Sequence, residues 1–98
     1  MLTPKQRSYL RSLASVMDPI FQIGKGGISA NLIKQVDDAL EARELIKLTA
    51  LQASPVKAAD ACRDLADATH AEAVFSIGNR LVLYRESKDN KRIFLNNI

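Results

Sequence analysis

The apolar residues of this chain switch repeatedly between the spacing of a helix and that of a strand, and this alternation strongly limits the possible folds. Residues 3–18, 29–43 and 54–69 repeat apolar side chains every three or four positions, which is typical of amphipathic helices. Residues 20–23, 45–51, 73–77 and 80–85 are short and mostly apolar, which predicts strands. The order helix–strand–helix–strand–helix–strand–strand predicts an α/β protein, a compact two-layer sandwich with a four-stranded mixed sheet.

Local signals predict where several of these elements begin. Thr3 is the expected N-cap of the first helix, with Gln6 at the position that completes a capping box. Ser29 is the expected N-cap of the second helix, and Ser54-Pro55 is the expected start of the third. The pair Gly78-Asn79 separates the last two strands and predicts a tight hairpin, because such turns need positive φ angles.

Length and composition fit one domain. The chain has 98 residues, of which 47% are hydrophobic and 26% charged, enough for one small core. We expect a domain over residues 1–86 and a polar tail over residues 87–98, which either docks back or pairs with a strand. The single cysteine, the polar N-terminus and the lack of a long apolar run predict a cytoplasmic protein with no membrane segment.

The net charge of +3 is distributed unevenly along the chain. Residues 1–34 carry five basic side chains against one acidic, and residues 80–98 carry five against two. Residues 35–79 carry four basic side chains against eight acidic ones. If the two ends meet in the fold, the molecule has one basic and one acidic side, as expected for a domain that binds a polyanion.

The sequence offers little for catalysis or for metal binding. His70, the single histidine, lies where the third helix is expected to end, and a histidine there suits the helix dipole. Cys62 lies on the inward stripe of that helix, where a thiol behaves as a small apolar group. The adjacent Asp37 and Asp38 lie on the outer face of the second helix. We therefore expect no enzyme, no catalytic residue, no metal and no cofactor.

The turn Gly24-Lys25-Gly26-Gly27 is the strongest candidate site in the chain. It follows a short strand and precedes a helix start, so its amides, its lysine and the helix N-terminus together favour an anion. The spacing fits neither a P-loop nor a dinucleotide fingerprint, which argues against a nucleotide cofactor. The alternative is that the glycines serve only tight packing between helix and sheet.

A polymeric phosphate backbone is the anion that suits this turn best. The spacing Gly24-x-x-Gly27 matches the loop with which KH domains clamp nucleic acid, although there the loop joins two helices. Arg7, Arg11 and Lys34 could extend the basic surface. Few aromatic residues are available for stacking, so the chain suits reading of backbone and shape.

Four segments, in their order along the chain, resemble a known family. They are residues 10–14 (LRSLA), 23–29 (IGKGGIS), 39–47 (ALEARELIK) and 77–85 (IGNRLVLYR). The chain is similar to the CRM domain, the chloroplast RNA splicing and ribosome maturation module, and in particular to its single-domain bacterial YhbY-type members. The resemblance covers about residues 2–86. It implies an RNA-binding α/β domain whose glycine-lysine loop contacts RNA, and in bacteria an association with precursors of the large ribosomal subunit.

Lys47, Arg80 and Arg85 are further basic candidates if the fold brings them beside the loop. The expected partner is therefore RNA, specifically ribosomal RNA in large-subunit precursors, bound by a monomer. The residues expected to contact it are Gly24, Lys25, Gly26, Gly27, Arg7, Arg11, Lys34, Lys47, Arg80 and Arg85.

Two other classes of function stay open at this point. A protein–protein adaptor on a ribosome-associated complex would use the acidic middle of the chain or its tail, and would respond weakly to salt. A small enzyme acting on a phosphorylated metabolite would need a catalytic base and metal ligands, which the sequence does not supply.

Overall fold

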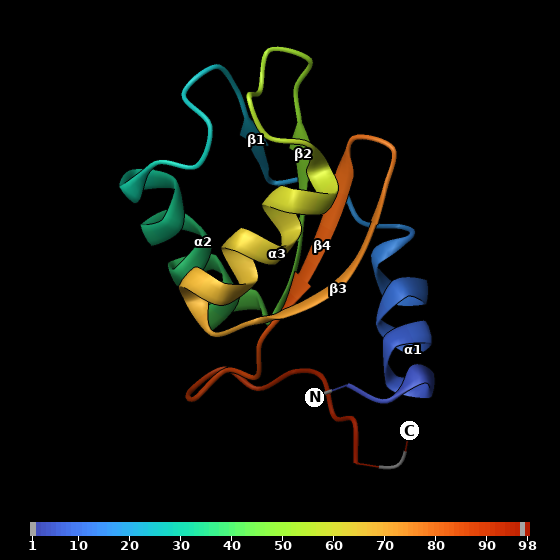
Figure 1. Cartoon of the computed structure of the whole chain (residues 1–98). Helices are drawn as coiled ribbons and strands as arrows, with labels where there is room; N and C mark the ends of the chain where they lie inside the picture. The colour runs from blue at the N-terminus through green and yellow to red at the C-terminus, as the bar shows by residue number, and fades with distance from the viewer. Residues whose placement is uncertain (1, 97) are drawn as a thin grey trace.

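The structure is a computed structural model that describes residues 2–96 and 98. Its helices are α1 (Pro4–Ala14), α2 (Ala30–Arg43) and α3 (Ala58–Thr69), and its strands are β1 (Phe21–Ile23), β2 (Leu45–Ala50), β3 (Glu72–Ile77) and β4 (Arg80–Tyr84). The predicted order α1-β1-α2-β2-α3-β3-β4 is confirmed (Figure 1).

The strands form one mixed sheet in the order β1-β2-β4-β3. Strands β1 and β2 are parallel because α2 carries the chain back between them, and β4 runs antiparallel to both β2 and β3. Gly78 has a φ of +58°, as the predicted hairpin turn requires. Between Ala73 and Phe75 the register of β3 shifts, so Val74 is an extra residue in a β-bulge.

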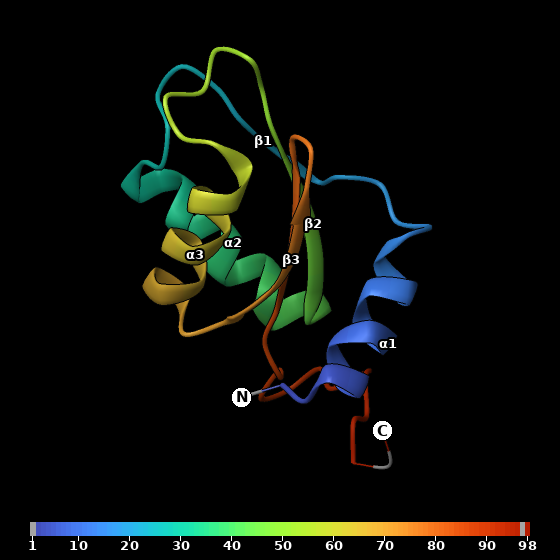
Figure 2. The ribbon, with the colours of Figure 1, turned by 45° about the vertical axis from the view of Figure 1, so that its right-hand side comes forward.

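The two faces of the sheet carry different helices. Helices α2 and α3 cover one face, where Leu40 and Leu65 pack with Leu48 and Leu81 in the main core. Helix α1 covers part of the opposite face, where Leu10 and its neighbours form a second apolar cluster. Helix α1 therefore adds a third layer to the predicted pair of layers (Figure 2).

Two of the predicted helix starts are confirmed. The capping box of Thr3 and Gln6 is present in both directions, and the Ser29 hydroxyl accepts a hydrogen bond from the Leu32 amide at 3.1 Å. The predicted start of α3 at Ser54-Pro55 is wrong. The helix begins at Ala58, because the Ser54 hydroxyl bonds to the backbone of Val56 and closes a local turn instead.

The tail docks back onto the end of α2, so of the two arrangements left open by the sequence the fold adopts docking. Glu44 is fully buried, and its carboxylate accepts hydrogen bonds from the amides of Ser87 at 2.8 Å, Arg92 at 2.6 Å and Ile93 at 2.8 Å. Burial by itself would raise the pKa of Glu44, but these three amides outweigh burial and hold the pKa below its ordinary value of 4.5.

Glu41, one helical turn earlier, binds the same tail. Its carboxylate accepts the Ser87 hydroxyl at 2.6 Å and the amides of Lys88 and Asp89 at 3.2 Å. The Ser87 hydroxyl and these two amides hold the pKa of Glu41 below 4.5. The side-chain amide of Gln6 donates to the Leu95 carbonyl at 3.2 Å, so the tail also runs beside the start of α1 (Figure 1).

Candidate nucleic-acid interface

The glycine-lysine loop lies at the end of the sheet where the parallel strands β1 and β2 finish, and it leads directly into α2 (Figure 1). A hydrogen bond of 3.0 Å from the Gly27 amide to the Gly24 carbonyl closes the turn. Lys25 and Gly26 are exposed at its tip. The loop therefore presents one positive charge and backbone without bulky side chains to solvent.

The glycines of this loop do not serve the same purpose. Gly27 has a φ of +63°, and a Cβ built there would lie 3.0 Å from Cγ of Pro55, so the fold requires glycine at this position. A Cβ at Gly26 would meet nothing within 4 Å, and one at Gly24 would make only an ordinary contact, 4.0 Å from Leu51. Packing thus explains Gly27 but leaves Gly24 and Gly26 without a structural reason.

The surroundings of the loop favour an anion. The first turn of α2 has no acidic residue, so the partial positive charge of its N-terminus is not neutralised there. The 51–57 loop packs beside the glycine loop through the contact of Pro55 with Gly27. It ends at Lys57, the exposed N-cap residue of α3, which makes no side-chain capping hydrogen bond. Lys57 adds a second lysine at this end of the molecule.

Four of the predicted basic contacts have side chains available at the surface. Lys25 and Arg80 are exposed and form no ion pair within residues 2–96 and 98. Arg11 is exposed and lies over the ring of Phe75, with 5.0 Å between its guanidinium carbon and the ring centre. Lys34 forms a 3.5 Å ion pair with Asp38, but both side chains are largely exposed, so this pair is weak.

Arg7, by contrast, is used within the fold. Its guanidinium donates to the carbonyl of Ala73 and, at 2.6 Å, to that of Val74. These carbonyls lie at the bulge of the edge strand β3, where the ladder leaves a residue unpaired. Arg7 therefore fastens α1 to the sheet.

Lys47, which the sequence offered as a further basic contact if the fold brought it beside the loop, is instead used within the fold. Only 8% of Lys47 is exposed, because α1 covers it. Its ammonium donates to the carbonyls of Ala14 and Met17, both at 3.1 Å. These carbonyls lie at the C-terminal end of α1, which a cation stabilises. Helix α1 ends at Ala14, where Lys47 makes this contact, and not near residue 18 as the sequence predicted.

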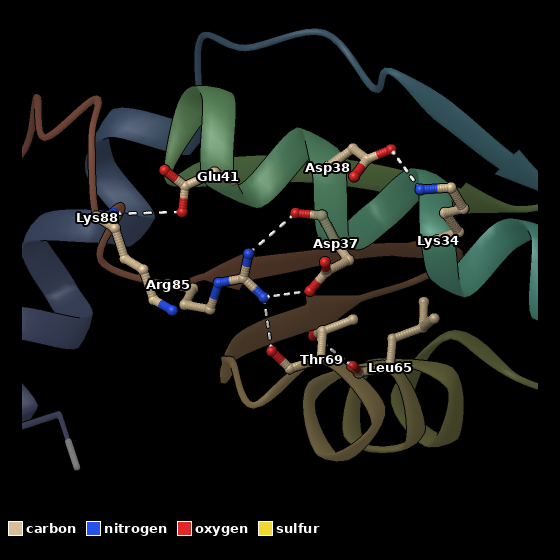
Figure 3. A network of polar contacts seen from close by, with 8 residues as sticks. All are labelled: Lys34, Asp37, Asp38, Glu41, Leu65, Thr69, Arg85 and Lys88. Carbon is tan, nitrogen blue, oxygen red and sulfur yellow. Dashed lines mark hydrogen bonds and ion pairs between the residues drawn. The ribbon is translucent and has the colours of Figure 1, made fainter.

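Arg85 joins α2 to the end of α3 (Figure 3). One nitrogen of its guanidinium donates to the Asp37 carboxylate at 2.5 Å and to the Thr69 carbonyl at 2.7 Å. The other donates to the Asp37 carbonyl at 3.0 Å. With its side chain only 20% exposed, Arg85 has most of its donors engaged inside the protein.

Charge divides the molecule into two sides. Helices α2 and α3, which carry a series of exposed carboxylates, lie on the side of the sheet away from α1, whereas the basic helix α1 and the C-terminal tail lie close together (Figure 2). The exposed acidic residues of the two helices are Asp37, Asp38, Asp60, Asp64 and Asp67. A polyanion therefore meets least repulsion at the loop and on the α1 side of the sheet.

Residues suited to catalysis do not come together in the described structure. His70 is an exposed C-cap of α3 in the left-handed conformation. Burial raises the pKa of the Cys62 thiol to about 11, which keeps it protonated. Over residues 2–96 and 98 there is no group of three or more potential metal-ligating side chains, and no described helix is long and apolar enough to cross a membrane.

A family model described as the CRS1/YhbY (CRM) domain matches residues 2–85. The chain belongs to this family. The resemblance seen in the sequence is thereby confirmed, and the match spans every helix and strand described above.

Two bacterial relatives and one solved structure align with this chain over nearly their whole length. The chain is 50% identical over 95 residues to the Bacillus subtilis protein named Probable RNA-binding protein YqeI, covering 97% of this chain and 99% of that one. It is 31% identical over 90 residues to a Haemophilus influenzae protein named RNA-binding protein, covering 92% and 91%. The solution structure of the hypothetical protein SAV1595 from Staphylococcus aureus is similar with a TM-score of 0.74 and 56% identity, covering 97% and 99%.

Sequence reasoning missed two sets of residues in this CRM domain. Gln22 and Thr49 lie beside Arg80 on the sheet. The strand pattern in the sequence does not show which part of this sheet face α1 leaves uncovered. Glu41 and Glu44 carried no signal as binding groups for the tail, because the positions of their partners depend on the whole fold.

Proposed function

We propose that this protein binds structured ribosomal RNA through the Gly24–Gly27 loop, and that it acts in assembly of the large ribosomal subunit as a cytoplasmic monomer. The observation that carries the proposal is the open space at Gly26, with no close packing at Gly24, beside the exposed Lys25. Glycines that the fold does not need leave room for a phosphate backbone to approach the loop amides. Membership of the CRM family and the names of two relatives support RNA as the partner.

The mechanism we propose is passive binding. The loop amides and Lys25 hold phosphates, while Arg11, Lys34 and Arg80 add electrostatic attraction, and no covalent bond is made or broken. A footprint of about 4 to 6 phosphates predicts that the logarithm of the association constant falls with the logarithm of salt concentration with a slope of about −4.

The double variant Lys25→Ala/Gly26→Ala tests the loop. The open space around Gly26 predicts a folded protein, while the lost charge and added methyl group should reduce affinity for large-subunit ribosomal RNA fragments by about tenfold or more. Binding is measured by fluorescence anisotropy, and folding by circular dichroism. Lys5→Ala, which removes the same charge from an exposed position at the far end of α1, is the matched control. Unchanged affinity in the folded double variant would refute the loop assignment.

The assembly role is tested by sedimentation of a cell lysate at low and high salt, followed by identification of the RNA crosslinked to the protein. We expect migration with large-subunit precursors at low salt and release at high salt. An adaptor would instead keep its partner after nuclease treatment and show a shallow salt response, and that outcome would contradict direct RNA binding.

A further inference from the structure

A row of side chains on the α1 side of the sheet is left uncovered because α1 ends before it reaches them. Gln22 of β1, Thr49 of β2 and Arg80 of β4 are successive cross-strand partners, and Ile77 of β3 completes the row. Gln22 and Arg80 are exposed, Thr49 is half-buried, and Ile77 is 61% exposed. All four strands thus contribute to one open strip at the loop end of the sheet.

This strip forms one wall of a groove. Pro19, Ile20 and Phe21 line the groove together with Gln22, Thr49 and Arg80, and its volume is about 650 Å³. This volume lies within the range of small-molecule sites and is sufficient for a nucleotide. Among the described residues, none that lines the groove is acidic.

The polar side chains of the groove have no partners among the described residues. Within residues 2–96 and 98, the Gln22 amide, the Thr49 hydroxyl and the Arg80 guanidinium make no side-chain hydrogen bond or ion pair, whereas Lys47 on the same sheet face donates to two carbonyls at the end of α1. An amide and a hydroxyl both donate and accept hydrogen bonds, and a guanidinium donates to phosphate or to a base edge. These groups suit an anionic ligand that also has hydrogen-bonding edges.

The groove lies next to the glycine-lysine loop along the chain, although no residue of the loop lines it. Gln22 precedes Gly24 by two residues, so a ligand held at the loop amides has the groove as its neighbour. On the opposite side of the loop, α2 and α3 cover the sheet and expose carboxylates such as Asp60 and Asp64. An RNA chain anchored at the loop is therefore favoured to continue over the α1 side of the sheet.

We propose that this groove holds one unpaired nucleotide of the RNA whose adjacent phosphate sits on the Gly24–Gly27 loop. The inference rests on the proposed RNA-binding function and adds its specificity. An unpaired nucleotide is required because a base that is paired and stacked in a duplex cannot enter a groove in the protein, whereas the bases of single-stranded loops and ends can be splayed out. Gln22 and Thr49 then read the base edge, and Arg80 neutralises the neighbouring phosphate.

The neutral double variant Gln22→Ala/Thr49→Val tests this inference, because it removes both hydrogen-bonding groups without changing any charge. Affinity is compared for two RNAs with equal numbers of phosphates: a hairpin with an unpaired loop and a fully paired duplex. We expect about a tenfold loss for the hairpin, equivalent to two lost hydrogen bonds, and no change for the duplex. Gln35→Ala, at an exposed position of α2, is the matched control and should bind both RNAs normally.

A second variant and a spectroscopic measurement make the outcome decisive. Arg80→Gln should weaken hairpin binding and make its salt slope shallower by about one unit. In an NMR titration with an unpaired pentanucleotide, the amides of residues 20–22, 49 and 80 should shift. Wild-type affinity of folded Gln22→Ala/Thr49→Val for both RNAs, with the loop variant still defective, would overturn the groove while leaving the loop intact. Failure of the wild-type protein to bind either RNA would remove the proposed function itself.

Discussion

Replacing Glu44 by glutamine tests whether a buried carboxylate holds the tail on the domain. One carboxylate oxygen accepts the amides of Arg92 and Ile93, and the other accepts the amide of Ser87. Glutamine keeps the shape and one acceptor oxygen, which can retain the first two bonds. Its NH₂ group then faces the Ser87 amide, so a donor meets a donor where the native protein has a charge-assisted hydrogen bond.

The expected cost follows from these contacts. Loss of one hydrogen bond to a charged group, together with the weakening of the other two, amounts to about 2 to 3 kcal/mol. A domain of this size has a total free energy of unfolding of about 5 to 15 kcal/mol. The melting temperature should therefore fall by on the order of 10 °C.

Urea and thermal unfolding followed by circular dichroism measure this loss, and hydrogen exchange locates it. The amides of Ser87, Arg92 and Ile93 should exchange faster in Glu44→Gln, while those of β2 and β4 stay protected until global unfolding. Glu86→Gln is the matched control, since Glu86 is exposed and its ion pair with Lys91 lies at the surface. A destabilisation below about 0.5 kcal/mol, or unchanged exchange at the three tail amides, would refute the reasoning.

Acid should have the same effect as this substitution. Because the native pKa of Glu44 lies below its ordinary value of 4.5, its contribution to stability is complete above about pH 4.5 and disappears as the pH falls through the native pKa. Glu41 acts in the same direction. The wild-type protein should therefore lose stability below about pH 4.5 more steeply than Glu44→Gln, and parallel pH profiles would contradict this assignment.

Three further variants or measurements test other contacts. Lys47→Met removes the donor to the end of α1, so the free energy of unfolding measured in urea should fall by about 1 to 3 kcal/mol. Proteolysis between α1 and β1 should also occur earlier. Wild-type stability would show that the buried ammonium makes no net contribution. Gly27→Ala should lower the free energy of unfolding by about 1 to 2 kcal/mol because of the positive φ at this position, and the close contact of its Cβ with Pro55 should lower it further. Gly26→Ala should unfold like the wild type. Cys62 should resist thiol reagents at pH 8 until the protein unfolds, because its pKa is about 11; fast labelling of folded protein would contradict its burial.

Local chemistry accounts for much of the fold. The capping box at Thr3, the cap at Ser29 and the turn at Gly78 each depend on a residue and its near neighbours in sequence, so these predictions could be made and are confirmed. The start of α3 was predicted wrongly because the Ser54 hydroxyl had two local options, a helix cap and a turn with Val56, and the sequence does not decide between them.

For the candidate site, too, some features follow from the local sequence and others only from the whole fold. The sequence by itself determined the element order, the four-stranded sheet and the position of the glycine-lysine turn at a strand end, because periodicity and turn chemistry are local properties. Only the tertiary structure decided which basic residues are available, since Arg7, Lys47 and Arg85 are engaged by groups 66, 33 and 48 positions away in the chain. It also decided that Gly27 serves packing while Gly26 is open, because that difference depends on Pro55, which only the folded chain brings to the loop.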